Sequence, residues 1–248
     1  MRTRRAGPGW KMCARSRAWQ QGREVQRERG SCRGLLGSAA YLTLGVMNLR
    51  AIVYGLAGIA AFVAWAAWYG DQNSCGAFPE WQTSPYVLPY AVGSTYLVSQ
   101  ANCSAGGHRR AYKYAYDFVM PIGTTVTAAR AGVVAEIRMK FVDGQPGEGE
   151  SNWIKIRHAD GTIAAYSHLT ANGALIKIGD SVVSGQPIGL SGNTGNTGGR
   201  PHLHFHLCPC SEPVDCGTLP VTFRNTDANA DGLHARRSYP ALPFKNGV

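Results

Sequence analysis

Residues 202–207 read His-Leu-His-Phe-His-Leu, and this alternation constrains the fold more than any other feature. Side chains of a β-strand point alternately to opposite faces, so a period of two predicts a strand. One face would hold Leu203, Phe205 and Leu207 and enter a core, and the other would hold His202, His204 and His206. Lys, Thr or Glu would serve equally well on a solvent-facing edge, whereas neutral imidazole is the commonest metal ligand. We therefore interpret the histidine face as part of a metal site.

The chain beyond about residue 85 is rich in short apolar runs separated by turn residues. Turn pairs such as Asp143-Gly144 and Asp160-Gly161 alternate with runs rich in β-branched and aromatic residues. The runs are residues 125–128, 132–137, 153–156, 162–166, 181–183 and 219–223. No long amphipathic helix is predicted after residue 70. The pattern indicates an all-β fold of mostly antiparallel sheets, with residues 142–151 as a loop between strands.

The basic character of the chain is confined to its N-terminal part. The formal net charge is +10, yet residues 1–50 hold eleven Lys and Arg against two acids, and residues 51–248 hold fourteen against thirteen. The folded part is nearly neutral and carries no RNA-binding motif, so we expect no nucleic-acid partner. Residues 1–46 are interpreted as an over-extended gene start or a disordered basic segment, with translation beginning at Met47.

Residues 51–69 form an uncharged apolar run directly after Arg50. This arrangement predicts that residues 47–70 are a signal peptide or a membrane anchor. Ala64-Trp65-Ala66 fits a cleavage site, while the aromatic residues at the end of the run fit a retained anchor, and both alternatives stay open. In either case the following residues would be exported, as a periplasmic, membrane-anchored or secreted protein.

Five cysteines follow the apolar run: Cys75, Cys103, Cys208, Cys210 and Cys216. The last three lack a paired C-x-x-C, so disulfides are favoured over a second metal site in an exported chain. The odd number leaves one thiol free, and the pairing cannot be read from the sequence. Asp227, Asn229 and Asp231 alternate as in a calcium loop, but no glutamate follows at the EF-hand position, which favours a turn-rich loop.

Three further residues join the histidine strand as candidates for metal chemistry. Asp117 stands in an apolar and aromatic run that reads as a buried strand, where an unpaired carboxylate needs a cation. His108 precedes it, and His168 lies in Tyr-Ser-His-Leu. Two histidines and one carboxylate with an open fourth position constitute a catalytic zinc arrangement, in which zinc activates a water molecule.

In their order, these elements resemble the lysostaphin-type (LytM-like) zinc metalloendopeptidases, which hydrolyse bacterial peptidoglycan. The matching segments are the Asp-Phe-x-x-Pro-x-Gly-Thr element at 117–124, the Tyr-x-His-Leu element at 166–169, the glycine-rich stretches at 179–189 and 191–195, and the His-x-His strand at 202–204. The resemblance covers residues 106–207. It implies mostly antiparallel sheets around a zinc-binding groove, preceded by the signal or anchor helix.

The resemblance also implies a role for each matching residue. His108, Asp117 and His204 would bind one zinc ion, and His168 and His202 would be the catalytic pair beside it. His206 would be a rim residue or a neighbour of the ligands, because the family does not use that position as a ligand. The sequence departs from the best-known members in placing eight residues, rather than three, between His108 and Asp117.

Other side chains are weaker candidates. From its position before the His-x-His strand, Arg200 is a hypothetical contact for a substrate carboxylate. Tyr112, Tyr114 and Tyr166 are candidate donors to an oxyanion, but core aromatic residues are an equally good interpretation.

We thus expect an exported zinc metalloendopeptidase that cleaves stem or cross-link peptides of peptidoglycan. A membrane contact through residues 51–69 is expected if the signal is not cleaved. The alternatives are a non-catalytic LytM-like regulator of cell-wall hydrolases and a secreted peptidase acting on glycine-rich proteins. The expected parts are an N-terminal extension over residues 71–105, a metallopeptidase core over 106–207, and a Cys-containing C-terminal strand and tail over 208–248.

Overall fold

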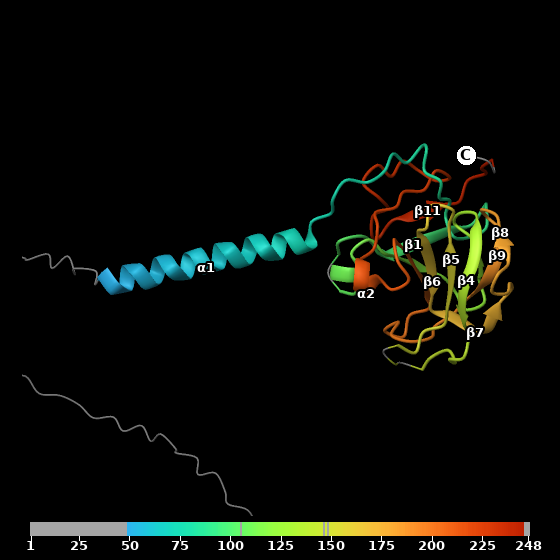
Figure 1. Cartoon of the computed structure of the whole chain (residues 1–248), viewed down its shortest axis with the longest axis horizontal. Helices are drawn as coiled ribbons and strands as arrows, with labels where there is room; N and C mark the ends of the chain where they lie inside the picture. The colour runs from blue at the N-terminus through green and yellow to red at the C-terminus, as the bar shows by residue number, and fades with distance from the viewer. Residues whose placement is uncertain (1–48, 105, 146, 148, 246–248) are drawn as a thin grey trace, which may run out of the picture. The chain divides into compact units, whose positions relative to one another are not determined.

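Eight strands form one sheet in the computed structural model (Figure 1), which describes residues 49–245 except 105, 146 and 148. Their order across the sheet is β11-β1-β2-β10-β6-β5-β4-β8, and all neighbours that pair are antiparallel. The strands are β1 (Thr95–Gln100), β2 (Tyr116–Val119), β4 (Gly132–Arg138), β5 (Trp153–Arg157), β6 (Ile163–Ser167), β8 (Ser181–Val182), β10 (His202–Cys208) and β11 (Ser238–Pro240). The predicted mostly antiparallel fold is confirmed. The expectations for residues 1–46 and for Met47 lie outside the described residues.

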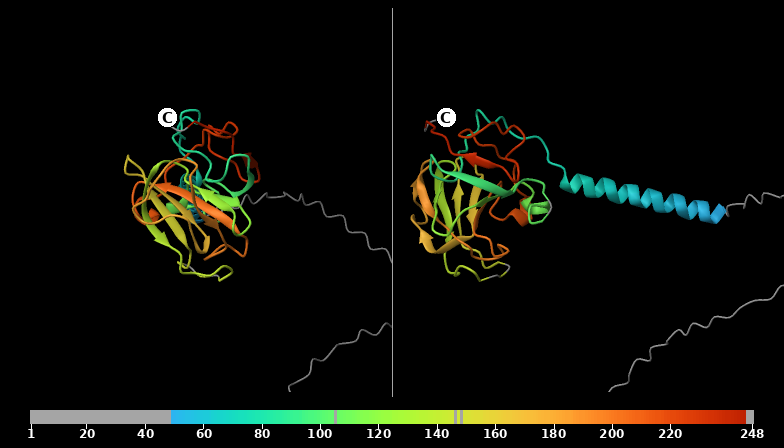
Figure 2. Two further views of the ribbon diagram at one scale, coloured as in Figure 1. Left: turned by 90° about the vertical axis from the view of Figure 1, so that its right-hand side faces the viewer. Right: turned by 180° about the vertical axis from the view of Figure 1, so that it is seen from behind.

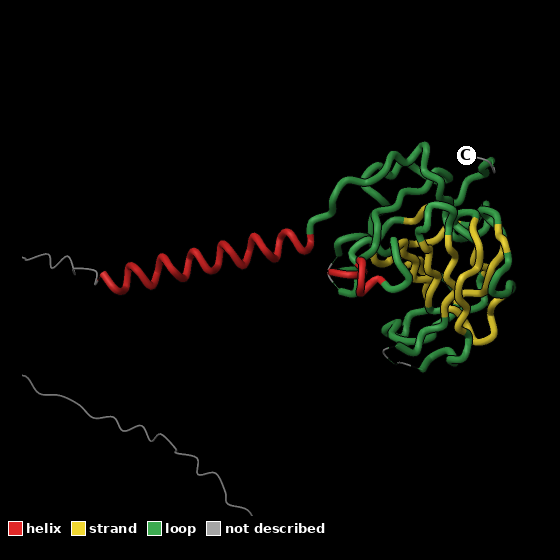
Figure 3. Tube along the Cα trace, viewed as in Figure 1, coloured by secondary structure: helices red, strands yellow, loops and turns green. Residues whose placement is uncertain are grey.

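A second, three-stranded sheet packs in the same body. Its order is β3-β9-β7, with β3 (Thr125–Thr127), β7 (Leu169–Ala174) and β9 (Pro187–Ser191). Figure 2 shows the strands of this body from two further sides. Long loops complete the body, chiefly between α1 and β1 and between β10 and β11 (Figure 3).

One long helix, α1 (Leu49–Asn73), contains the predicted apolar run. Arg50–Gly70 is the single helical stretch of the described chain that is long and apolar enough to cross a membrane, with a mean hydropathy of 1.8 over its most apolar window. A signal sequence has the same properties. The remaining helical elements among the described residues are short: the 3₁₀-helix η1 (Arg110–Tyr112) and α2 (Pro213–Cys216).

The alternation of β10 has the predicted consequence for the core. Leu203, Phe205 and Leu207 are buried, and they pack in one cluster with aromatic side chains of β2 and β6. The cluster includes Tyr116, Phe118 and Tyr166, and the Phe205 and Tyr166 rings meet edge to face at 5.3 Å. Because this face is apolar throughout, the opposite face of the same strands carries the polar residues.

The strand predicted for residues 219–223 is wrong. The segment is extended and buries Val221 and Phe223, but its backbone groups bond mainly to side chains instead of to a neighbouring strand. Phe223 N–H donates to Asn229 Oδ1 at 2.9 Å, and Val221 O accepts from the Tyr116 hydroxyl at 2.9 Å. An alternating apolar pattern predicts which side chains are buried, whereas a strand also needs a neighbouring strand with free backbone groups. The strand of the tail is β11, at Ser238–Pro240.

Two disulfides are present, in agreement with the cysteine analysis. Cys75 pairs with Cys103, and Cys210 pairs with Cys216. Cys208 is the free, buried cysteine among the described residues, as the odd count required. The first disulfide joins the segment that follows α1 to the loop preceding His108, and the second closes a small loop after β10.

Candidate metal centre

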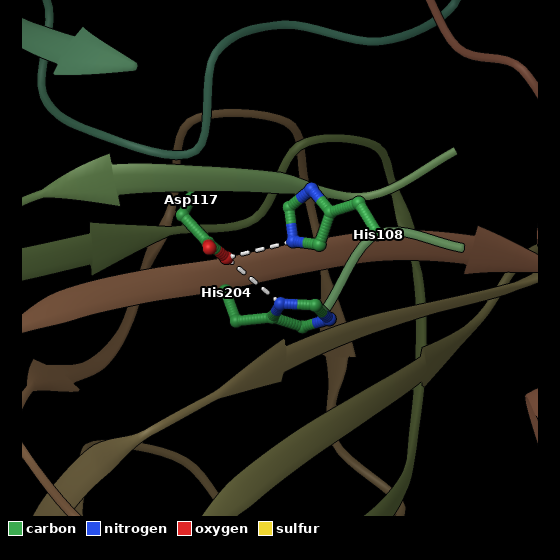
Figure 4. Close-up of side chains that lie close together, drawn as sticks. All are labelled: His108, Asp117 and His204. Atoms are coloured by element: carbon green, nitrogen blue, oxygen red, sulfur yellow. Dashed lines mark hydrogen bonds and ion pairs between the residues drawn. The ribbon is translucent and has the colours of Figure 1, made fainter. Parts of the chain in front are cut away.

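Asp117 and His204 face each other across the β2–β10 ladder, where they are direct cross-strand partners. Partners opposite each other share one face of a sheet, here the face away from the Leu203 side. His108 comes from the loop before η1, and the three side chains point toward one another (Figure 4). His108 Nε2 lies 3.1 Å and His204 Nδ1 lies 2.8 Å from Asp117 Oδ1.

The hydrogen bonds of His108 orient its free nitrogen toward the carboxylate. His108 Nδ1 lies 3.1 Å from the carbonyl oxygen of Ala101, and a carbonyl only accepts, so Nδ1 carries the hydrogen. In the neutral ring Nε2 then presents a lone pair to Asp117. Two acceptors in contact inside a protein require a cation or a proton between them.

When its proton resides on Nε2, His204 presents a second lone pair, that of Nδ1, to the Asp117 carboxylate. His204 Nε2 lies 3.2 Å from His206 Nδ1, which can accept this proton in a hydrogen bond. His204 Nδ1 then faces Asp117 as an acceptor. Burial lowers the pKa of His204, against the opposing effect of Asp117, which favours the neutral ring.

The donor set fits a metal ion. The ligand atoms of His108, Asp117 and His204 lie within 4.8 Å of one another, and all three residues are buried or nearly so. Burial alone would raise the pKa of Asp117; without a metal, hydrogen bonds from His108 and His204, and their charges when the rings are protonated, hold it below its usual range, so the carboxylate is ionised. Two imidazole nitrogens and one carboxylate are a ligand set of zinc. No second group of this kind occurs among the described residues, including the 227–231 loop.

His168 and His202 lie beside this cluster. Their rings meet at 4.7 Å between centroids, and the His168 ring is 5.8 Å from that of His204. Each donates Nδ1–H to a backbone carbonyl, His168 to Thr194 at 2.7 Å and His202 to Arg200 at 2.8 Å. In the neutral form of each ring, Nε2 is therefore an acceptor. The structure thus brings all five predicted residues together, while their roles stay a prediction.

The position of His168 depends on Ser151, which the sequence analysis missed. His168 has a positive φ of 64°, which is unfavourable for a residue with a side chain. Ser151 Oγ accepts from the backbone N–H of His168 at 3.0 Å and lies 3.3 Å from its Nδ1. Burial, with the nearby His202 and His204, lowers the pKa of His168 to about 3, so the ring is neutral near pH 7.

A cavity of about 520 Å³ opens over the cluster. Of the three candidate tyrosines, Tyr112 lines it, with its ring 5.9 Å from that of His204. The Tyr166 hydroxyl accepts instead from Ala129 N–H in the core, and that of Tyr114 accepts from Gly76 N–H. Arg200 is not among the lining residues; its carbonyl orients His202.

Comparison with known proteins finds similarity to a peptidase family over the part of the chain that holds most of this site. Residues 111–216 match the model of Peptidase family M23, a segment that begins three residues after His108. An uncharacterized metalloprotease from Buchnera aphidicola is 31% identical over 137 residues, which cover 55% of this chain and 33% of that protein. The peptidoglycan DD-endopeptidase ShyA from Vibrio cholerae is 42% identical over 99 residues, covering 40% of this chain and 21% of that protein.

Among solved structures, the catalytic domain of lysostaphin from Staphylococcus simulans aligns with 50% of this chain and 87% of its own, at 28% identity and a TM-score of 0.37. The chain matches only a third or less of the length of the two relatives above.

Proposed function

We propose that this chain, whose residues 111–216 match the model of Peptidase family M23, is an exported zinc metalloendopeptidase that hydrolyses peptides of bacterial peptidoglycan. The observation that carries the proposal is the convergence of His108, Asp117 and His204 at one cavity, with His168 and His202 beside them. The family's relatives include a peptidoglycan endopeptidase, which supports the substrate class.

In the proposed site, His108 Nε2, the Asp117 carboxylate and His204 Nδ1 would hold one zinc ion. When bound, zinc would lower the pKa of a water ligand and polarise the substrate carbonyl. His168 and His202 present their Nε2 atoms to the same space, since their Nδ1 hydrogens are engaged by Thr194 O and Arg200 O. One Nε2 accepts the proton of the attacking water, and a protonated Nε2 donates to the developing oxyanion or the leaving amine.

Export is the second part of the proposal. It is supported by the apolar helix at Arg50–Gly70 and by the two disulfides, which persist in oxidising compartments. The same helix would serve as a membrane anchor if it is retained.

The test is the release of soluble peptide fragments from purified peptidoglycan by the full chain. We expect release that stops when a chelator removes the metal and returns when zinc is restored, with one zinc bound per chain. His204→Ala should abolish both the release and the zinc, whereas His234→Ala, at an exposed histidine, should leave both intact.

Undiminished release by His204→Ala would sink the proposed mechanism. A chain without bound zinc that releases nothing would support the non-catalytic regulator instead. Cleavage of glycine-rich proteins without cleavage of peptidoglycan would support the secreted peptidase.

A further inference from the structure

The cavity extends from the candidate metal centre across three more strands of the large sheet. The register sets two parallel rows of side chains on the cavity face of β10, β6, β5 and β4. The first row is His204, Ser167, Trp153 and Arg138, and the second is His206, Ala165, Lys155 and Glu136.

In the middle of the two rows, β6 contributes only the small side chains Ser167 and Ala165, both of which line the cavity. The side chains become large again on β5, with Trp153 and Lys155. Since neighbouring strands are about 4.8 Å apart, the backbone of β5 lies roughly 10 Å from that of β10. A peptide bound across the small side chains of β6 would therefore reach the side chains of Trp153 and Lys155.

Lys155 is a buried ammonium group whose hydrogens are all used. It donates to Glu212 Oε1 at 2.6 Å and to Ser211 O at 3.1 Å, and it lies 3.0 Å from Glu136 Oε2. An ammonium has three N–H donors, so none is left for a ligand. Two carboxylates share this one cation, which gives the three-residue cluster a net charge of −1.

The two carboxylates differ in their access to the cavity and in whether an oxygen is left without a partner. Glu136 does not line it, and both its oxygens are engaged, Oε1 by Trp153 Nε1 at 2.7 Å and Oε2 by Lys155. Glu212 lines the cavity with a side chain that is 52% exposed, and its Oε2 has no partner in the described part of the chain. Glu212 sits inside the loop closed by the Cys210–Cys216 disulfide. Lys155 and the disulfide therefore fix a carboxylate whose free oxygen can accept a hydrogen bond.

The first row ends on β4 with a cation, Arg138. Arg138 donates Nε–H to Ser151 O at 2.9 Å and an Nη2 hydrogen to Gly149 O at 2.7 Å, with its guanidinium over the Trp153 ring. A cation at the end of this row repels an ammonium group, which directs such a group toward the Glu212 side.

From this arrangement we propose that Glu212 forms a substrate subsite for an ammonium group, on a peptide whose scissile bond lies at the candidate metal centre. The inference rests on the proposed function, and it adds a substrate requirement: a free amine on the same peptide, displaced from the cleaved bond toward the Lys155 and Glu212 side of the cavity. The amine can belong to a diamino-acid side chain or to the peptide's amino terminus. A preorganised carboxylate favours this group because its charge-assisted hydrogen bond needs little further ordering.

The experiment compares synthetic peptides with one free side-chain amine and the same peptides acetylated at that amine. Affinity for the zinc-loaded full chain is measured by fluorescence anisotropy, and cleavage is measured in parallel. We expect acetylation to weaken binding by about tenfold or more, and Glu212→Gln to weaken binding of the free amine by the same factor without changing that of the acetylated peptide. A peptide with only its terminal amine free separates the two sources of ammonium.

Glu136→Gln is the matched control, because it removes an equal charge from the Lys155 cluster without touching the cavity. It should retain the preference for the free amine. Bound zinc and the melting temperature are measured for each variant, so a folding defect is recognised.

Equal affinity of the wild-type chain for both peptides would overturn the inference even if Glu212→Gln did not fold. So would an equal loss in Glu136→Gln and Glu212→Gln. Peptides that bind with the expected preference but are never cleaved would count against the proposed function alone.

Discussion

At the scale of single residues, tautomers decide what the candidate metal centre can do. His108, His168 and His202 each lie within hydrogen-bonding distance of a backbone carbonyl through Nδ1, which leaves each Nε2 as an acceptor in the neutral ring. His204 uses the opposite nitrogen, Nδ1, toward Asp117. This difference follows from position. His204 projects from β10 beside its cross-strand partner, whereas His108 lies in a loop, His168 lies between β6 and β7, and His202 is the first residue of β10.

His206 is the residue on which this arrangement of His204 depends. His206→Leu removes the acceptor for His204 Nε2–H, 3.2 Å away, and frees the ring to turn or to change its tautomer. We expect zinc affinity to fall by about 10- to 100-fold, measured by competition with a chromogenic chelator. His206→Gln, which supplies a side-chain oxygen, should recover part of the loss. Unchanged affinity in His206→Leu would show that His206 does not orient the ligand.

At the scale of elements, loops are fixed to the sheets by a few buried polar side chains. Asn152 is fully buried at the start of β5, where its side chain accepts from Phe141 N–H at 2.9 Å and donates to Phe141 O and Leu169 O at 2.8 and 3.1 Å. It thereby joins the loop that follows β4 to the start of β7. Ser151, its neighbour, holds His168, so the same short segment supports the catalytic pair.

Asn152→Ala should lower the free energy of unfolding by about 2–4 kcal/mol, because it removes the hydrogen bonds to both backbone groups of Phe141 and one of the two that Leu169 O accepts. Urea denaturation measures the change. Gln145→Ala, in the exposed part of the same loop, is the matched control and should stay within about 0.5 kcal/mol of wild type. A similar small effect for Asn152→Ala would mean that water or a rearranged loop replaces these bonds.

At the scale of the whole molecule, a buried histidine away from the cavity ties stability to pH. His158 is 3% exposed, donates Nδ1–H to Ala131 O at 2.9 Å, and has no partner for Nε2 in the described structure. Burial lowers its pKa below the usual value, against the opposing effect of the Ala131 hydrogen bond. The unfolded chain therefore binds this proton at a higher pH than the folded chain does.

Stability from His158 is fully present above the unfolded pKa of about 6.5, and it is lost as the pH falls from there toward the lowered folded pKa. We expect His158→Gln to reduce the drop in unfolding free energy between about pH 7.5 and about pH 5. Both proteins are measured by urea denaturation with a chelator present, so that metal release does not contribute. Identical drops would show that His158 is not buried in its neutral form.

The local features of this protein could be predicted from its amino acids alone. Alternation in residues 202–207 sufficed for a strand with an apolar and a histidine face, because the strand period is a property of the backbone. The apolar run at 51–69 gave a helix for the same local reason, and the antiparallel class followed from short strands and turns. The chemical types of the candidate site, imidazoles and one buried carboxylate, were also readable without coordinates.

The contacts between residues far apart in the chain became known only from the folded structure. The strand expected at 219–223 lacks a ladder partner, and the contacts of Ser151 and Thr194 with His168 depend on loops that no periodicity describes. The same holds for the free oxygen of Glu212, which depends on the register of three strands and one disulfide. Local periodicity is encoded within a few residues, whereas these contacts require loop closure and pairing between segments far apart in the chain.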